Sequence, residues 1–231
     1  MPERASVVLK TLHCIKQNDE AGQGSEPYLW PFLAALPFGD FQSTPKGGTT
    51  QSAPKLVFGN ELAPGQSVAL QPPFNTLSID FKPGQHDHQL VLVAALLEDD
   101  RTNPVAIAAG QEAFLKLLNR QAGRYLELLA ADPDDAIPIA LDIADEARAA
   151  AMDAIAAKMT ALDKVFNRRD DLLGIAVRGF RKPLQHGIRN FVLTFDSPGN
   201  RFTLDGTLNF FTPIQDPGHT PTTGGNAPAP G

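Results

Sequence analysis

Three groups of acidic side chains lie where apolar runs of the sequence give way to polar segments. They are Asp19 with Glu20 and Glu26, then Glu98 to Asp100, and then Asp170 with Asp171. Calcium takes six to eight oxygen ligands, which carboxylates and carbonyls of flexible loops can supply. We therefore expect a calcium site if the fold brings the three segments to one end. The alternative is that these residues are acidic because loops are solvated, since no group has the ligand spacing of an EF-hand loop.

A second candidate for metal chemistry is the sequence His86-Asp87-His88, which follows a Pro-Gly turn. Alternate residues of a strand face the same side, so the two histidines could hold a transition metal with help from His13 or His186. A metal-assisted hydrolase is the corresponding hypothesis, and solvated turn residues are the alternative. The sequence contains no nucleophile elbow, phosphate-binding glycine loop, His-Glu-x-x-His pair or dinucleotide-binding motif.

The elements that would position these residues are mostly short strands. Apolar or alternating runs predict strands at 6–15, 55–60, 67–71, 77–81, 90–97, 173–180, 189–195 and 201–211. The continuous apolar run 90–97 is typical of a strand buried on both faces. Segment 28–36 contains Pro31 and precedes Pro37, which predicts an edge strand or an irregular segment. Segment 42–54 is rich in Ser, Thr, Gly and Pro and predicts a surface loop.

Between the strands lies a block with helical periodicity. Asn103 followed by Pro104 is typical of a helix start. A four-residue acidic segment, 132–135, interrupts the pattern, so we expect two antiparallel helices between Asn103 and about Asn167. This hairpin packs on the sheet or on itself, or alternatively its alanine-rich face docks a partner helix.

Composition restricts the class of protein. The chain has 231 residues with 19 Gly and 20 Pro, which argues against an all-helical bundle, and 42% hydrophobic residues, which argues against wholesale disorder. Its formal net charge of −6 and the absence of a basic run make nucleic acid an unexpected partner. No apolar run is long enough to span a bilayer, and the amino terminus has no signal-peptide pattern. We expect a soluble protein that is cytoplasmic or exported without a classical signal.

Cys14 is the only cysteine, so the chain forms no internal disulfide, and its apolar strand predicts a buried, inert thiol. From residue 212 the sequence is Pro, Gly, Thr and Asn with almost no core-forming side chain. This composition predicts a disordered tail over 212–231.

Short patches of the sequence carry a resemblance to a known family. Leu-His-Cys-Ile at 12–15 leads through the first acidic segment to Ser-Glu-Pro-Tyr-Leu at 25–29, Leu-Leu-Glu-Asp-Asp occupies 96–100, and Asp-Asp-Leu-Leu-Gly occupies 170–174. Together they resemble C2-type calcium-dependent β-sandwich modules, interrupted by a helical insertion. The resemblance implies that acidic loops bind Ca²⁺ and present it to an anionic lipid surface or a protein partner. The positions it implies are Asp19, Glu26, Glu98, Asp100 and Asp170.

The sequence thus predicts an antiparallel β-sandwich formed by residues 1–102 and 168–211, with a helical hairpin inserted at 103–167 and a tail at 212–231. The favoured function is a non-enzymatic binding or assembly module. It would act through its acidic loops, with calcium assistance, or through the face of the hairpin. The alternatives are a metal-assisted hydrolase using His86 and His88, or a structural component of a larger assembly. The ligand, the partner and the oligomeric state are left open.

Overall fold

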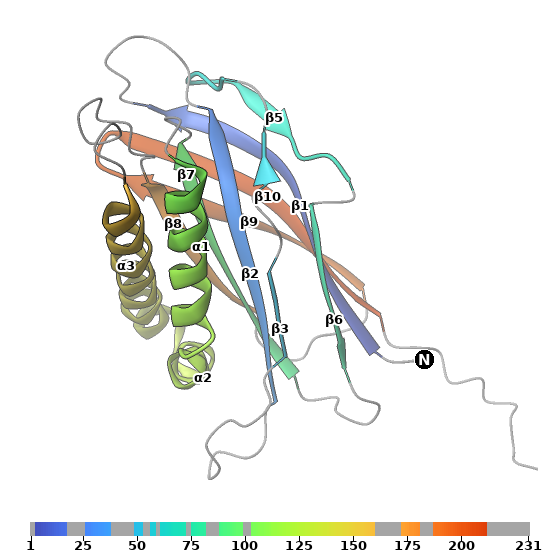
Figure 1. The fold of residues 1–231 in the computed structure, drawn as a ribbon. Coiled ribbons are helices and arrows are strands. Elements are labelled where there is room, and N and C mark those ends of the chain that lie inside the picture. The colour runs from blue at the N-terminus through green and yellow to red at the C-terminus, as the bar shows by residue number, and fades with distance from the viewer. Residues whose placement is uncertain are drawn as a thin grey trace, which may run out of the picture.

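A computed structural model shows a β-sandwich with a layer of helices on one side (Figure 1). The structure describes residues 3–17, 26–37, 49–52, 56–58, 61–72, 75–81, 88–98, 103–159, 172–180 and 187–211. Within them, two five-stranded antiparallel sheets face each other and three helices cover the outer side of the second sheet. The predicted fold class, an antiparallel sandwich with an inserted helical block, is confirmed.

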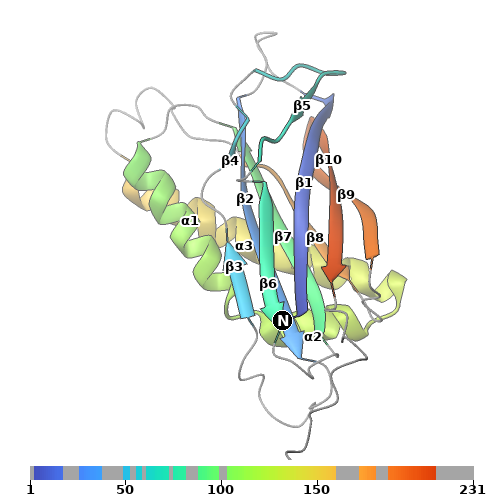
Figure 2. The same cartoon turned by 90° about the vertical axis from the view of Figure 1, so that its right-hand side faces the viewer.

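Sheet 1 contains both the first and the last strand of the described chain. It is built from β1 (Glu3–Lys16), β5 (Ser67–Ala69), β6 (Thr76–Phe81), β9 (Gly187–Ser197) and β10 (Asn200–Phe211). The order is β5-β1-β10-β9, and β6 also pairs with β1. β5 and β6 lie one after the other along the same edge of β1 (Figure 2). At the opposite edge, β9 is the terminal strand.

Sheet 2 separates the two apolar cores of the molecule. It is built from β2 (Pro27–Pro37), β3 (Thr49–Ser52), β4 (Leu56–Val57), β7 (His88–Glu98) and β8 (Leu172–Phe180), in the order β3-β2-β7-β8 with β4 also on β2. Along β7, Leu92 and Leu96 face the core between the sheets, whereas Val93 and Leu97 face the core under the helices. Because both faces of β7 are buried, its sequence is apolar without alternation, as predicted.

The prediction for segment 28–36 is wrong. This segment is β2, an inner strand that pairs with β7 over its whole length. On its other side, β4 pairs with Tyr28 and Leu29, and β3 pairs with residues 32–35. Pro31 lies in the gap between these two partners, so its missing N–H interrupts no ladder on that side. The partner strand β3 also falls inside 42–54, where the sequence predicted only a loop.

Within residues 103–159, the helical block contains three helices instead of two. They are α1 (Pro104–Leu118), α2 (Ala122–Ala130) and α3 (Pro133–Lys158). The Asn103 side chain accepts a hydrogen bond from the Val105 N–H, as the predicted helix start requires. The Asn119 side-chain amide donates to the Leu115 carbonyl and helps to end α1. The long α1 and α3 lie side by side, and the short α2 connects them (Figure 1).

The helical layer packs closely on sheet 2 and on itself. Trp30 of β2 and Phe114 of α1 are both fully buried, with ring centroids 5.9 Å apart. Where α1 meets α3, a Cβ at Gly110 would lie 2.5 Å from Ile155 Cγ1, which is closer than two carbon atoms can approach. Gly110 therefore permits the close approach of the two helices.

The pairing of β1 with β10 contains an irregularity. Asp205 and Gly206 lie inside β10, and opposite them the register shifts between Leu9 and Thr11 of β1. Gly206 leaves room for the ring of Phe191 on β9, because a Cβ there would lie 2.3 Å from Phe191 Cζ. The predicted tail at 212–231 and the end of the predicted hairpin beyond Met159 lie outside the described residues.

Candidate functional site

The predicted calcium ligands are only partly described by the structure. Glu26 is exposed directly before β2, and Glu98 is the half-buried last residue of β7. Pro27 pairs with Glu98, so these two glutamates lie at the same end of sheet 2. Leu172, the first residue of β8, is at that end too because it pairs with Leu97. Asp19, Asp100 and Asp170 lie outside the described residues, so the calcium site stays a prediction.

The predicted histidine site is not assembled by the described residues. His88 is the first residue of β7 and pairs with Pro37, whereas His86 and His186 lie outside the described chain. His13 is on sheet 1, where its ring contacts Ser67 and Asp205. Among the residues that the structure describes, no three His, Cys, Asp or Glu side chains group closely enough to hold a metal ion.

A long open groove, which sequence reasoning missed, runs along the seam between the two sheets. One part has a volume of about 580 Å³ and the other about 290 Å³. Ile137, Ala140, Val177 and Arg178 line both parts, so the two are continuous. We call this feature the seam groove, and it is lined by α3 together with residues 175–180 of β8 and 189–194 of β9.

The seam groove opens on strand edges, as its lining shows. Successive side chains of a strand point to opposite faces, so a groove on a sheet face would be lined by every second residue. Here six consecutive residues of β8 and six of β9 take part. In the described chain β8 pairs only with β7, and β9 only with β10. Within the described residues, the edges of β8 and β9 that carry no further strand therefore meet at this groove.

Gly174 closes one end of the seam. A Cβ on this residue would lie 2.9 Å from the backbone nitrogen of Asp196 and 2.9 Å from Cβ of Phe195, so β8 and β9 touch here. The φ of Gly174 is 156°, which favours glycine. Residues 175–180 and 189–194 continue from this contact along the groove.

The chemistry of the seam groove is apolar with positive charge. Ile137 and Leu141 of α3 are 59% and 60% exposed, and Val192 of β9 is 51% exposed, although all three are large apolar side chains. Among the described residues that line the groove, the charged ones are Arg178 and Arg189. Both are cationic in a chain whose formal net charge is −6. The groove is suited to an apolar ligand that carries negative charge.

Helix α3 presents three different flanks, and one of them forms the wall of the groove. Beside the groove, Ile143 and Ala147 are fully buried and define its core side. At 3.6 residues per turn, Ile137 lies about 120° and Leu141 about 160° around the helix from Ile143. Asp142 and Glu146 fall on the remaining flank. The exposed apolar pair thus belongs to neither the core side nor the ionic side.

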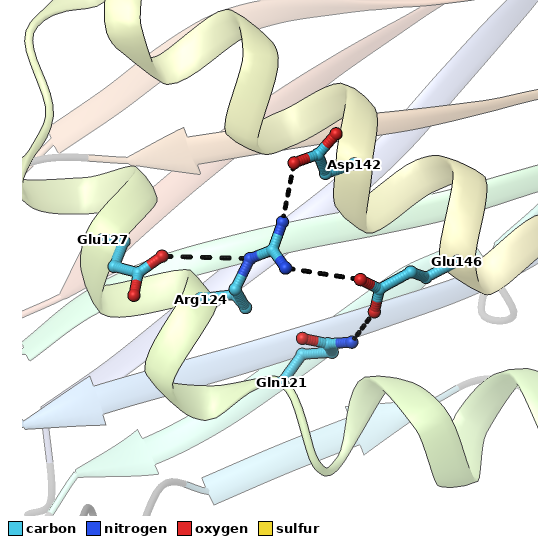
Figure 3. A network of polar contacts seen from close by, with 5 residues as sticks. All are labelled: Gln121, Arg124, Glu127, Asp142 and Glu146. Carbon is cyan, nitrogen blue, oxygen red and sulfur yellow. Dashed lines mark hydrogen bonds and ion pairs between the residues drawn. The ribbon is translucent and has the colours of Figure 1, made fainter.

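The ionic flank fixes α3 to α2 (Figure 3). The Arg124 guanidinium of α2 donates to Asp142 at 3.0 Å and to Glu146 at 3.3 Å, and its Nε lies 3.8 Å from Glu127. The side-chain amide of Gln121 also donates to Glu146. Exposed ion pairs each contribute little free energy, but several on one guanidinium fix its orientation. The network holds the position of α3 and hence of the groove wall.

The amino-acid sequence contains no clear signal for this groove. At 3.6 residues per turn, Ile137 lies five full turns from the buried Ile155, so its spacing does not distinguish it from the buried residues of α3. The two arginines gave no signal, because their meeting depends on the sheet order.

Comparisons with known proteins find similarity among solved structures. No family model matches the sequence, and no curated protein does. Among solved structures, the chain is similar to a C2 domain of plant Extended Synaptotagmin 1, with 10% sequence identity and a TM-score of 0.35. That match covers 92% of this chain and 98% of the synaptotagmin domain. The match transfers no ligand to this chain.

Within the described residues, no helix combines the length and the hydropathy that a bilayer-spanning segment requires.

Proposed function

We propose that this protein is a binding module whose seam groove holds an extended, acidic segment of a partner protein. The proposal rests on the lining of the groove, to which β8 and β9 each contribute the edge of six consecutive residues. The partner would add as a strand between the two sheets, so recognition would use both its backbone and its side chains.

The backbone part of the recognition follows from unpaired strand edges. A terminal strand presents N–H and C=O groups that another extended chain can pair with. Peptides that bind in this way gain affinity from main-chain hydrogen bonds and specificity from the pockets that take alternate side chains. Along 190–194 of β9, the N–H and C=O groups of alternate residues point away from β10 and can pair with a partner strand of about five residues.

The side-chain part follows from the groove's composition. Ile137, Leu141 and Val192 offer apolar contact for one row of partner side chains. Arg178 of β8 can form a bidentate hydrogen bond with a carboxylate. An alternating apolar and acidic segment is therefore the sequence that fits best.

A fluorescent ten-residue peptide that alternates Val with Glu tests the proposal by anisotropy. We expect it to bind, and a peptide that alternates Val with Lys to bind at least about tenfold more weakly, since one charged hydrogen bond contributes about 1.5 kcal/mol or more. Arg178→Glu should reverse this preference. Arg120→Glu makes the same change of charge at an exposed position outside the groove, and it should leave the preference unchanged.

Two results would contradict the proposal. One is equal binding of the acidic and basic peptides to the unmodified protein. The other is tight binding to vesicles of anionic phospholipid that Arg178→Glu abolishes while the acidic peptide does not bind. That second result would assign the groove to a membrane surface.

Calcium assistance is a separate proposal, supported by the pairing of Pro27 with Glu98, which places two of the predicted ligand residues at one end of sheet 2. It does not depend on the seam groove, which is formed from other residues. The metal-assisted hydrolase using His86 and His88 has no comparable support among the described residues.

A further inference from the structure

A row of three polar side chains crosses the outer face of sheet 1, away from the seam groove. Ser67 Oγ lies 2.7 Å from Nδ1 of His13, and Nε2 of the same ring lies 2.9 Å from Oδ2 of Asp205. The three residues come from the adjacent strands β5, β1 and β10. Hydroxyl, imidazole and carboxylate are thus connected in the order that activates a serine for nucleophilic attack.

The strand register fixes this arrangement. Ser67 is the direct cross-strand partner of His13, so the two side chains stand next to each other on one face. Asp205 pairs with Thr11, two residues before His13 on β1, and reaches the ring diagonally. Leu12, Cys14 and Leu204 alternate with these residues and are buried between the sheets. Burial of that opposite face holds the strands at this register.

The imidazole is oriented to accept a proton from Ser67. A carboxylate oxygen only accepts hydrogen bonds, so the ring nitrogen beside Asp205 carries the hydrogen. In the neutral ring the other nitrogen, Nδ1, then has a free lone pair directed at Ser67 Oγ. Asp205 therefore selects the tautomer in which His13 can act as a base.

The serine is also accessible from the open edge of the sheet. An open hollow of about 330 Å³ is lined by Ser67, Glu61, Leu62, Gln66 and Val68. The bonds from Cys14 N–H to the Gln66 carbonyl, 3.0 Å, and from Leu70 N–H to the Lys10 carbonyl, 2.7 Å, flank Ser67 along β5. Because bonding alternates along an antiparallel pair, the backbone N–H of Ser67 points away from β1 toward this edge.

The geometry points to Ser67 as a nucleophile that His13 and Asp205 activate toward short-chain carboxylic esters. Ser67 Oγ bonds to the carbonyl carbon, and its proton moves to His13 Nδ1. The backbone N–H of Ser67 is placed to stabilise the developing oxyanion. The bond to the leaving alcohol then breaks, and this alcohol takes the proton from His13. A water molecule next attacks the acyl carbon and gives a proton to His13, which returns it to Ser67 Oγ as the acid leaves.

The hollow determines the class of ester. Leu62 and Val68 offer a small apolar surface for a short acyl chain, and the Gln66 side chain adds a polar group. The carboxylate of Glu61 disfavours substrates with a negative charge near the reacting carbon. Esters of small acids with neutral alcohols fit this lining best.

An uncharged fluorophosphonate probe tests the proposal, because it forms a stable bond only with an activated serine. We expect a single adduct in the intact mass of the full chain, and peptide mapping should place it on Ser67. Ser67→Ala should abolish the adduct. His13→Gln should slow its formation about 100-fold, the usual contribution of a general base. p-Nitrophenyl acetate should give a burst of p-nitrophenol that Ser67→Ala removes.

Ser78 provides the matched control. Its hydroxyl lies 2.8 Å from the hydroxyl of Ser6, on adjacent strands of the same sheet, whereas the His13 ring contacts Ser67 and Asp205. Ser78→Ala should therefore not change labelling. Absence of any adduct on the folded, unmodified chain would overturn the proposal, whatever the variants do. Labelling that is equally fast in His13→Gln would overturn the proposal too, because the reactivity of Ser67 would then not depend on the His13 imidazole.

Discussion

Gly110 allows the packing of the helical layer to be tested with a single methyl group. A Cβ at this position would lie 2.5 Å from Cγ1 and 2.9 Å from Cδ1 of Ile155, and 3.2 Å from the carbonyl oxygen of Ala151. Carbon atoms in contact are normally about 3.5–4.0 Å apart, so α1 or Ile155 has to move by about 1 Å. Overpacking of this kind costs about 1–3 kcal/mol.

Alanine is also a better helix former than glycine, so the steric cost has to be measured against a control. Gly123 is exposed on α2, and a Cβ added there would meet no neighbouring atom within 4 Å. Gly123→Ala should stabilise the protein by about 0.4–1 kcal/mol. We expect the free energies of unfolding of the two variants to differ by about 1–3 kcal/mol, with Gly110→Ala the less stable. Urea denaturation followed by circular dichroism measures both.

A double-mutant cycle identifies the contact that is responsible. Ile155→Ala alone should cost about 2–5 kcal/mol, because it leaves a cavity in a fully buried site. Adding Gly110→Ala to that variant should be neutral or stabilising, because the new methyl group enters the space that Ile155 vacated. The steric explanation would be refuted if Gly110→Ala were as stabilising as Gly123→Ala, or if the two substitutions at the contact were simply additive.

Three further predictions concern single groups. Burial raises the pKa of the Tyr125 hydroxyl, which donates a hydrogen bond to the Leu118 carbonyl at 3.0 Å. Loss of this bond in Tyr125→Phe should lower the free energy of unfolding by about 1 kcal/mol, which urea titrations measure. An unchanged midpoint of unfolding would contradict the contribution of this bond. Burial also raises the pKa of the Cys14 thiol, so the folded state keeps its proton to higher pH than the unfolded state does. The free energy of unfolding should therefore fall as the pH rises above about 8.5, the pKa of an unfolded cysteine. In Cys14→Ala it should fall less steeply. Thermal melts of both proteins between about pH 8 and 10 measure the difference. Millimolar calcium should raise the melting temperature if Glu26 and Glu98 contribute to a calcium site, and Glu98→Gln should reduce the shift; no shift would rule out the calcium proposal.

The sequence predicted the parts of the fold that depend on residues close together in the chain. The unbroken apolar run of β7 reflects burial on two faces, and the Asn103-Pro104 pair starts α1 where expected. Whether β2 is an inner strand or an edge strand depends instead on the positions of β3 and β4, which leave a gap beside Pro31. No local sequence pattern shows this gap. In the same way, the break at Asn119 interrupts a helical periodicity that continues on both sides of it.

The candidate sites depend even more on distant pairing. His13 and Ser67 are 54 residues apart, and His13 and Asp205 are 192 apart, so only the strand register brings the three together. The seam groove requires that β8 and β9 be the terminal strands of different sheets. No local pattern of the sequence contains that arrangement, so neither wall of the groove could be predicted.

Hydrogen–deuterium exchange tests the central claim, that the seam groove binds an extended acidic segment along β9. The exchange of backbone amides over 189–194 is measured with and without the alternating Val and Glu peptide, and β3, the terminal strand on the other edge of sheet 2, serves as the internal control. We predict slower exchange in β9 at saturating peptide and no change in β3. Unchanged exchange in β9 while the peptide is bound would contradict the claim.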